Sequence, residues 1–270
     1  MWQQGTIRNI RNKAFGITLF LVTAAVVFPN RGRSEQAAAM PNVAEQYLLD
    51  AANQERAARG IPPLRRDPVL ARAALYHANQ MAAHAEISHQ FPGEPELSAR
   101  GAHAGARFSL ITENVAEAGN SAVIHDLWMH SKGHRENLLD PNVDSVGISV
   151  VVRNHEFFAV EDFASTVKDI SFNEQELKVA ALLKESGVQI GAKGISVEDA
   201  RRTCSMSTGY AGRRQPWFVM RYTAGRLSEL PSQLQARLNS GKYHEAVVGA
   251  CISTDSGPFT AYNIAVLLYP

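Results

Sequence analysis

Residues 112–147 constrain the fold more than any other part of the chain. They read TENVAEAGNSAVIHDLWMHSKGHRENLLDPNVDSVG. An acidic Glu113-Asn114 pair opens an apolar segment, a short amphipathic helix follows, and a turn then carries His134. A strand, a helix and a polar turn in this order predict mixed α and β structure.

Two helices are expected before this stretch. Asn42 can cap the first, with Glu45 at the capping-box position and Gly60 as the terminator. Asp67 can cap the second, and Pro68 occupies its first position, where a missing N–H costs nothing. Spacings of three, four and seven put apolar residues on one face of each helix. These are Val43, Tyr47, Leu48, Ala51, Ala52 and Ala58 in the first, and Leu70, Ala71, Ala74, Leu75, Ala78, Met81 and Ala82 in the second.

The later elements are predicted from caps and alternation. A strand over residues 111–116 carries Glu113 and is followed by a helix that residues 120–121 cap and Gly133 stops. That helix carries the apolar i,i+4 pairs Val123–Leu127 and Ile124–Trp128. Strands over residues 146–152 and 157–163 then form a hairpin with a four-residue connection. Helices interleaved with a short, mostly antiparallel sheet predict an α-β-α sandwich.

These residues and spacings resemble the CAP superfamily, which groups cysteine-rich secretory proteins, antigen 5 and pathogenesis-related 1 proteins, in its short bacterial form. The resemblance covers residues 42–164, nearly half of the chain. The family's opening pattern, Asn-x-x-Arg followed by Gly-hydrophobic-x-x-Leu, is met at Asn53, Arg56, Gly60, Ile61 and Leu64. The resemblance implies an α+β fold of the CAP type, with structural roles for Asn53, Arg56 and Trp128.

In the CAP family two histidines and two acids line a cavity, and in some members the histidines hold a divalent metal. The resemblance places His89, Glu113 and His134 in this cavity, with His89 and His134 as the metal ligands. Two imidazoles and a carboxylate suit Zn²⁺, and Glu113 would act either as a third ligand or as a general base. The family's second acid is absent, and the sequence leaves open whether Asp126, His125 or His130 replaces it.

Beyond Ser165 the character of the sequence changes, and no family resemblance is evident. A helix is predicted over residues 173–184, with Leu177, Ala180 and Ala181 on one face. β-rich segments are predicted at 217–224, 245–253 and 259–269, and a short helix at 230–238. In the last segment Tyr262, Ile264, Val266 and Leu268 alternate on one face. We therefore expect an N-terminal segment over residues 1–39, a CAP domain over 40–166 and a smaller α+β domain over 167–270.

The first 39 residues resemble an export signal. Arg8, Arg11 and Lys13 precede an apolar run over residues 14–28, and small residues at 37–39 could be cleaved. The alternative is an uncleaved anchor, which would be the only membrane contact expected. Both place the rest of the chain outside the cytoplasm, so we expect a secreted, periplasmic or envelope-associated protein. In that setting the only two cysteines, Cys204 and Cys251, are expected to form a disulfide.

The charge balance argues against a nucleic-acid partner. Residues 1–39 hold five of the 27 basic residues and one of the 26 acidic residues. The remainder therefore has 22 basic and 25 acidic residues, a net charge of −3. A mildly acidic protein lacks the basic surface that binds a phosphate backbone.

Three functions are consistent with these patterns. The leading hypothesis is a non-catalytic binding module whose cleft at His89, Glu113 and His134 takes a small ligand, a lipid or a peptide, with a weakly bound Zn²⁺ or other divalent metal as an option. The alternative is a metal-dependent hydrolase or peptidase that acts on envelope or extracellular polymers. A third hypothesis is a structural or interaction protein that works through its C-terminal domain.

Overall fold

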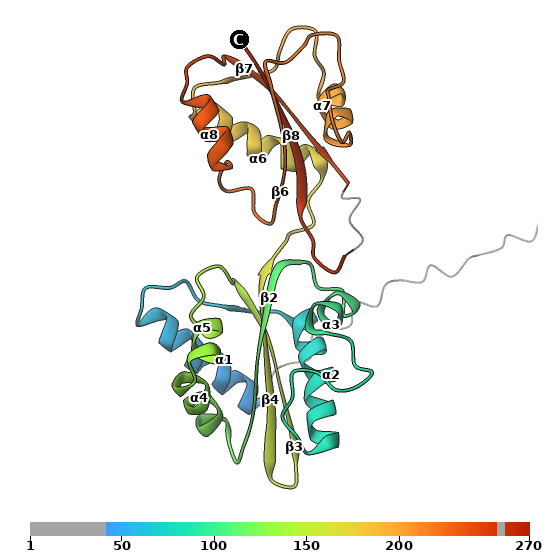
Figure 1. Cartoon of the computed structure of the whole chain (residues 1–270). Helices are drawn as coiled ribbons and strands as arrows, with labels where there is room; N and C mark the ends of the chain where they lie inside the picture. Colours follow the sequence, from blue (N-terminus) through green and yellow to red (C-terminus); the bar gives the residue numbers. More distant parts are fainter. Residues whose placement is uncertain (1–41, 253–256) are drawn as a thin grey trace, which may run out of the picture. The chain divides into compact units, whose positions relative to one another are not determined.

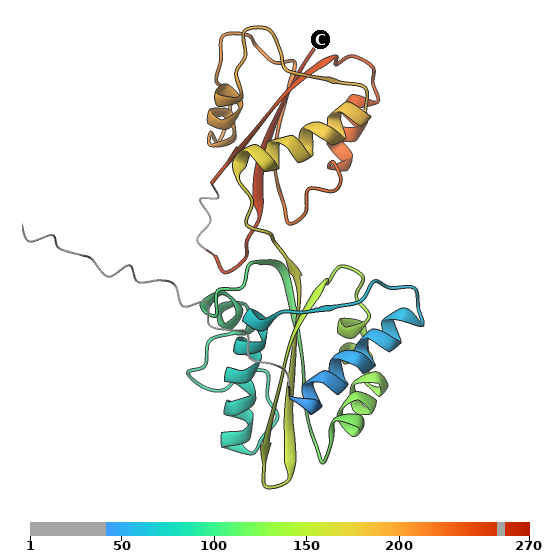
Figure 2. The same cartoon turned by 180° about the vertical axis from the view of Figure 1, so that it is seen from behind.

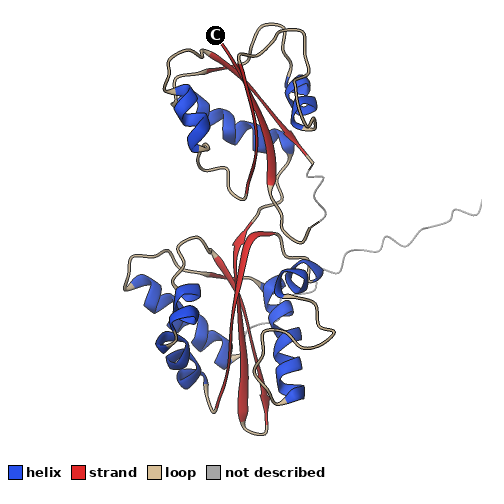
Figure 3. Ribbon diagram, viewed as in Figure 1, coloured by secondary structure: helices blue, strands red, loops and turns tan. Residues whose placement is uncertain are grey.

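The computed structural model describes residues 42–252 and 257–270. It contains two four-stranded sheets, and each is covered by helices on both faces (Figures 1 and 3). The expected export signal or anchor lies outside the described residues. No helix in the described ranges is both long and apolar enough to cross a membrane.

The first sheet belongs to residues 42–166. Its elements are α1 (Val43–Ala57), β1 (Arg65–Arg66), α2 (Pro68–His84), α3 (Leu97–His103), β2 (Phe108–Ala118), α4 (Ser121–His130), α5 (Lys132–Leu138), β3 (Ser145–Arg153) and β4 (Glu156–Thr166). The strand order is β1-β3-β4-β2, with β1 parallel to β3 and the other pairs antiparallel. Helices α1, α4 and α5 cover one face and α2 and α3 the other, as Figure 2 shows from behind. The α-β-α sandwich of the CAP type is therefore confirmed.

Both predicted helix starts are confirmed. Asn42 and Glu45 form a capping box at α1, and the Asp67 carboxylate accepts from the first N–H groups of α2. The predicted faces are only partly right. Leu48, Ala52 and Arg56 are the buried residues of α1, whereas Val43 is 90% and Tyr47 45% exposed.

The other helices show the same kind of error. In α2 Leu75 is exposed while His77 is buried, and in α4 Ile124 and Trp128 are buried while Val123 and Leu127 are exposed. Each helix touches its sheet along a narrower stripe than apolar spacing alone suggests.

Gly133 does not stop a helix, so that prediction is wrong. Helix α4 ends at His130, Ser131 takes an extended conformation, and Gly133 lies within α5. A glycine inside a helix costs only about 1 kcal/mol relative to alanine, so it need not end one. His134 consequently lies on a helix rather than in a turn.

The β3–β4 hairpin is tighter than predicted. Arg153 pairs with Glu156, so only Asn154 and His155 form the connection, and both have positive φ angles of 50° and 68°. Gly147 of β3 lies directly under α2. A Cβ there would stand 2.2 Å from the backbone carbon of Leu70, so glycine permits this close packing.

The second sheet belongs to residues 167–270. Its elements are α6 (Phe172–Glu185), β5 (Gln189–Ile190), α7 (Val197–Cys204), β6 (Phe218–Ala224), α8 (Ser232–Leu238), β7 (Glu245–Cys251) and β8 (Tyr262–Tyr269). The alternation predicted for β8 is confirmed, and its other face is buried too. In α6 Leu177 is 61% exposed, contrary to the prediction, and Val179, Ala180 and Leu183 are buried instead.

The two sheets share one topology. The second has the order β5-β7-β8-β6, with β5 parallel to β7 and the other pairs antiparallel, which repeats the first sheet strand for strand. A left-handed glycine follows the first helix in both cases, Gly60 after α1 and Gly187 after α6. The regions have separate buried clusters among the described residues. Their independence as domains stays a prediction.

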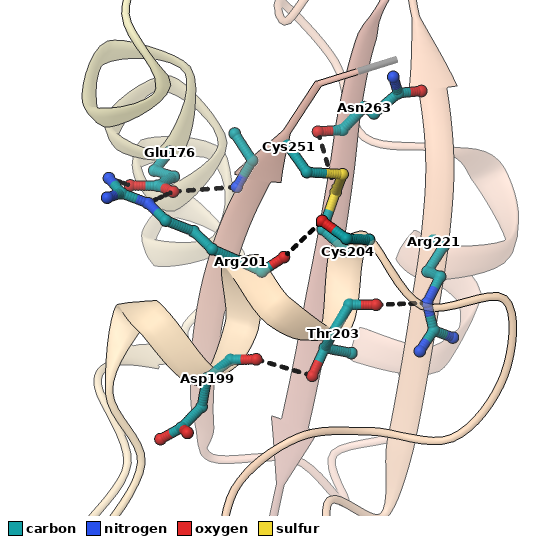
Figure 4. Close-up of a disulfide and its surroundings, with 10 residues drawn as sticks. Glu176, Asp199, Arg201, Thr203, Cys204, Arg221, Cys251 and Asn263 are labelled. Atoms are coloured by element: carbon teal, nitrogen blue, oxygen red, sulfur yellow. Dashed lines mark hydrogen bonds and ion pairs between the residues drawn. A yellow bond between two sulfur atoms is a disulfide. The ribbon is translucent and has the colours of Figure 1, made fainter. Parts of the chain in front are cut away.

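The predicted disulfide is confirmed. Cys204 at the end of α7 is bonded to Cys251 at the end of β7, with the Cα atoms 5.7 Å apart (Figure 4). The bond fastens the short helix α7 to the sheet. One turn earlier in α7, Arg201 makes a two-pronged ion pair with Glu176 of α6 at 2.7 Å. Glu176 also accepts from the Ala250 N–H of β7 at 2.9 Å.

Candidate functional site

Glu113 is the centre of the candidate site. It projects from the middle of β2, and its side chain is only 3% exposed. His89 Nδ1 lies 2.8 Å from Glu113 Oε1, and Arg100 of α3 donates to the other oxygen, Oε2. Both carboxylate oxygens are therefore held by protein groups, one of them permanently cationic.

His89 is the solvent-facing member of this arrangement. It lies in the loop after α2, and its side chain is 62% exposed. The hydrogen bond with Glu113 raises the pKa of His89 above its ordinary value, against the opposing effect of burial. Arg100 Nη1 donates to the His89 carbonyl at 3.1 Å, so the arginine that holds Glu113 also holds the histidine loop.

His134 reaches the site from α5. Its carbonyl accepts from Asn114 Nδ2 at 3.1 Å, and Asn137 Nδ2 donates to Asn114 Oδ1 at 3.0 Å and to the Glu113 carbonyl at 3.1 Å. Burial lowers the pKa of His134, and the charge of His89 lowers it further. His134 is thus close enough to His89 for their charges to interact, and His89 in turn contacts Glu113.

Sequence reasoning missed a buried layer beneath these three residues. His77 of α2 is fully buried, with Nδ1 2.8 Å from Glu94 Oε1 and Nε2 2.7 Å from the Ser88 carbonyl. Glu94 also accepts from the Phe91 N–H at 3.0 Å and lies 3.8 Å from Arg100. The signal for His77 in the sequence was a single histidine on an alanine-rich helix face.

Two further acids were missed on β4. Asp162 pairs with Glu113 in the strand register, and Glu161 pairs with Asn114. Both are fully buried, Glu161 close to the Asn114 side chain and Asp162 close to the Glu113 carboxyl. Burial raises the pKa of Asp162 well above its ordinary value, with the Glu113 charge adding to it, and burial raises the pKa of Glu161 to about 8. Two adjacent acids in an otherwise apolar strand were the signal.

The residues expected to be structural make framework contacts. The Arg56 guanidinium donates to the carbonyls of Pro62, Leu138, Asp140 and Val143 at 2.8–3.2 Å. Asn53 exchanges two hydrogen bonds with the Leu64 backbone, and Trp128 Nε1 donates to the Val115 carbonyl at 3.1 Å. These bonds tie loops and helices to the sheet, so a structural role stays the simplest interpretation.

The sequence left open whether Asp126, His125 or His130 replaces the family's second acid. In the part of the chain that the structure describes, none of the three contacts Glu113. Asp126 and His130 pair with each other at 3.2 Å, with side chains 70% and 79% exposed. Burial lowers the pKa of His125. The acids that do lie beside Glu113 are Glu94 and Asp162.

The arrangement fits a strong metal site poorly. Within residues 42–252 and 257–270 no three His, Cys, Asp or Glu side chains form a group that could hold a metal ion. Glu113 is engaged by Arg100 and by His89 Nδ1, so the ring nitrogens left to bind a metal are His89 Nε2 and those of His134. A catalytic zinc normally takes three protein ligands, so His89 and His134 fit weak binding at most.

Comparison with known proteins agrees with this fold. Residues 49–163 match the sequence profile of the CAP family, described as the cysteine-rich secretory protein family. This part of the chain is a CAP domain of the bacterial type.

Among curated proteins, the chain is similar to "Uncharacterized protein YkwD" of Bacillus subtilis (strain 168), with 29% identity over 110 residues. The match covers 40% of this chain and 42% of that protein, so the chain spans less than half of its relative's length. Similar solved structures include an extracellular protein containing a SCP domain from Bacillus anthracis str. Ames, at 27% identity and a TM-score of 0.42 over 44% of this chain and 39% of that one. An outer surface protein from Borrelia burgdorferi shows 19% identity and a TM-score of 0.42, over 45% of this chain and 91% of that one.

Proposed function

We propose that the CAP domain is a non-catalytic binding module. The surface formed by His89 and His134 over Glu113 receives a small ligand, a lipid or a peptide. The observation that carries this proposal is the state of Glu113, whose two oxygens are bound by His89 and Arg100 while the side chain is 3% exposed.

A general base needs a free lone pair within hydrogen-bond reach of the proton it removes. Glu113 has neither the exposure nor an unengaged oxygen, because His89 and Arg100 each hold one of its oxygens. The Glu113–Arg100 pair is better suited to holding His89 in place. The exposed His89 imidazole, whose pKa Glu113 raises, then offers an N–H donor to a polar ligand group.

The proposal includes export to an oxidising compartment, either the cell exterior or the periplasm and envelope. The Cys204–Cys251 disulfide supports it, since such bonds persist mainly outside the cytosol. Thiol titration of protein taken directly from cells measures this, and two free cysteines in that material would argue against export.

Mass spectrometry of material that co-purifies with the protein tests the binding function. We expect wild type to carry a ligand that His134→Ala loses and His130→Ala keeps, because His130 is an exposed histidine of the same region outside the site. Titration with Zn²⁺ should show weak binding that also requires His134 and that falls at low pH as protons compete for the imidazoles.

Glu113→Gln separates binding from catalysis. A binding module should retain its ligand in this variant. If instead the protein hydrolyses an envelope polymer and Glu113→Gln lowers turnover by about 10²–10⁴-fold with little change in substrate binding, the hydrolase alternative is correct.

A further inference from the structure

The shared topology allows positions in the two sheets to be matched. Gly147 of β3 packs against the peptide unit between Leu70 and Ala71 of α2. Gly249 of β7 packs in the same way against the peptide unit between Ala200 and Arg201 of α7, again with a distance of 2.2 Å from a hypothetical Cβ. These two glycines therefore occupy equivalent positions.

The strand register extends the match to the candidate site. Gly147 pairs with Asp162, which pairs with Glu113. Gly249 pairs with Ala265, which pairs with Arg221. Arg221 thus stands where the CAP domain has Glu113, and alanine stands where it has the buried Asp162. The charge at the centre of the sheet face is reversed.

The helix that covers this face is also different. Helix α2 has 17 residues and α7 only 8. In the CAP domain Val115 and Val160 pack under α2. Their counterparts in the second region are Thr223 and Asn263, two residues along the strands from Arg221 and Ala265 and on the same face of the sheet.

A pocket of about 500 Å³ opens on this part of the second sheet. Arg221, Thr223 and Asn263 line it, together with Ser205, Ser207 and the Cys204–Cys251 disulfide. Among the described residues that line it there is no carboxylate. Figure 4 shows Arg221 and the disulfide on the same part of the sheet, with the carbonyl of Thr203 of α7 bonded to the Arg221 guanidinium.

Among the described residues, Arg221 has no carboxylate partner, unlike the arginines near it. Arg201, Arg202 and Arg214 each pair with a carboxylate. Among the described residues, Arg221 donates only to backbone carbonyls, from Nε to Thr203 at 2.6 Å and from Nη2 to Gly209. These bonds fix the guanidinium without neutralising it, and its Nη1 group makes no contact that the described residues record.

We propose that this pocket is a second ligand site, which binds a small polar molecule through an oxyanion, either a carboxylate or a phosphate. Arg221 supplies the charge and a preoriented donor edge, which suits oxyanion recognition. The hydroxyl groups of Ser205, Ser207 and Thr223 and the Asn263 amide supply hydrogen bonds to the rest of the ligand. The site is independent of His89 and Glu113, so it stands or falls apart from the function proposed for the CAP domain.

Isothermal titration calorimetry of the full chain with three sugars that share a ring tests the proposal. The probes are glucuronate, glucose 6-phosphate and neutral glucose. We expect at least one charged sugar to bind about tenfold or more tightly than glucose. The reason is that a hydrogen bond to a charged group contributes more binding free energy than a hydrogen bond between neutral groups. The charged sugar that binds better identifies the oxyanion.

Three variants assign any binding to the pocket. Arg221→Gln should weaken it about tenfold or more, and Thr223→Val, which leaves the arginine and its carbonyl bonds intact, by about fivefold. Lys242→Gln removes one exposed charge from the same region outside the pocket lining and should change the Kd by less than about twofold. Equal binding of glucose, no binding of any sugar, or binding that survives Thr223→Val unchanged would overturn the proposal.

Discussion

The two regions of this protein share a topology but differ in what they bury. The CAP domain buries seven acidic, basic or histidine side chains: Arg56, His77, Glu94, Arg100, Glu113, Glu161 and Asp162. Among the described residues of the second region, Glu176 is the only side chain of these types that is buried. Since the second region forms the same frame with one buried side chain of these types among its described residues, the frame does not require all seven. Buried charges cost free energy, so the gathering of His77, Glu94, Arg100 and Asp162 around Glu113 points to function rather than to folding.

The largest expected effect comes from removing Arg100. Arg100→Ala leaves Glu113 and Glu94 buried without their cation, which should lower the free energy of unfolding by about 3–5 kcal/mol. Arg201→Ala is the matched variant in the second region. Because the Arg201 side chain is 32% exposed, this variant should lower the free energy of unfolding by less than Arg100→Ala does. Urea unfolding of both variants makes the comparison. Equal losses would remove the distinction drawn between the two regions.

The glycine pair comes next and tests the shared frame. Gly147→Ala and Gly249→Ala each place a Cβ against helix backbone, which must move away from the sheet. Both should destabilise the protein by about 3 kcal/mol, the upper end for overpacking. Gly133→Ala is the control, since nothing lies within 4 Å of a Cβ there and the residue is helical. A tolerated alanine at only one of the two positions would break the equivalence.

The third prediction concerns the pH dependence of stability that Glu161 gives the CAP domain. Its pKa is raised from 4.5 to about 8, so its neutral form stabilises the fold fully below pH 4.5, and that contribution is lost as the pH rises through 8. Glu161→Gln stays neutral at every pH. Between pH 5 and pH 7 the variant should therefore gain about 2 kcal/mol relative to wild type. Urea midpoints at both pH values measure this difference, and parallel pH profiles would contradict it.

The smallest effect concerns His89. Its pKa is raised by Glu113, so the stabilisation it adds is present below pH 6.5 and disappears as the pH rises through the raised value. Because the side chain is 62% exposed, His89→Ala should cost well under about 1 kcal/mol at pH 6. Thermal unfolding of the variant measures the loss. A large loss would make His89 a framework residue rather than a ligand contact.

Local signals in the sequence predicted helix starts well, because a cap depends on residues three positions apart. Asn42 and Asp67 are examples. The faces of helices were predicted less well, since Val43 and Leu177 follow the apolar spacing but lie outside the contact stripe. His89, Glu113 and His134 were found through resemblance. The buried residues around them, such as Asp162, were not predicted. The pairing of Asp162 with Glu113 depends on the strand register, which is set by tertiary packing.

The order of strands along the chain also bears on how the protein is made. In each sheet the last strand to be synthesised is an inner one, β4 in the first and β8 in the second. β2 and β3 have no antiparallel neighbour until β4 arrives, and β6 and β7 have none until β8 arrives. Through each interval the unfinished sheet exposes unpaired strand edges, which are prone to wrong pairing. Each region therefore passes through a stage of synthesis at which a chaperone would protect its open sheet.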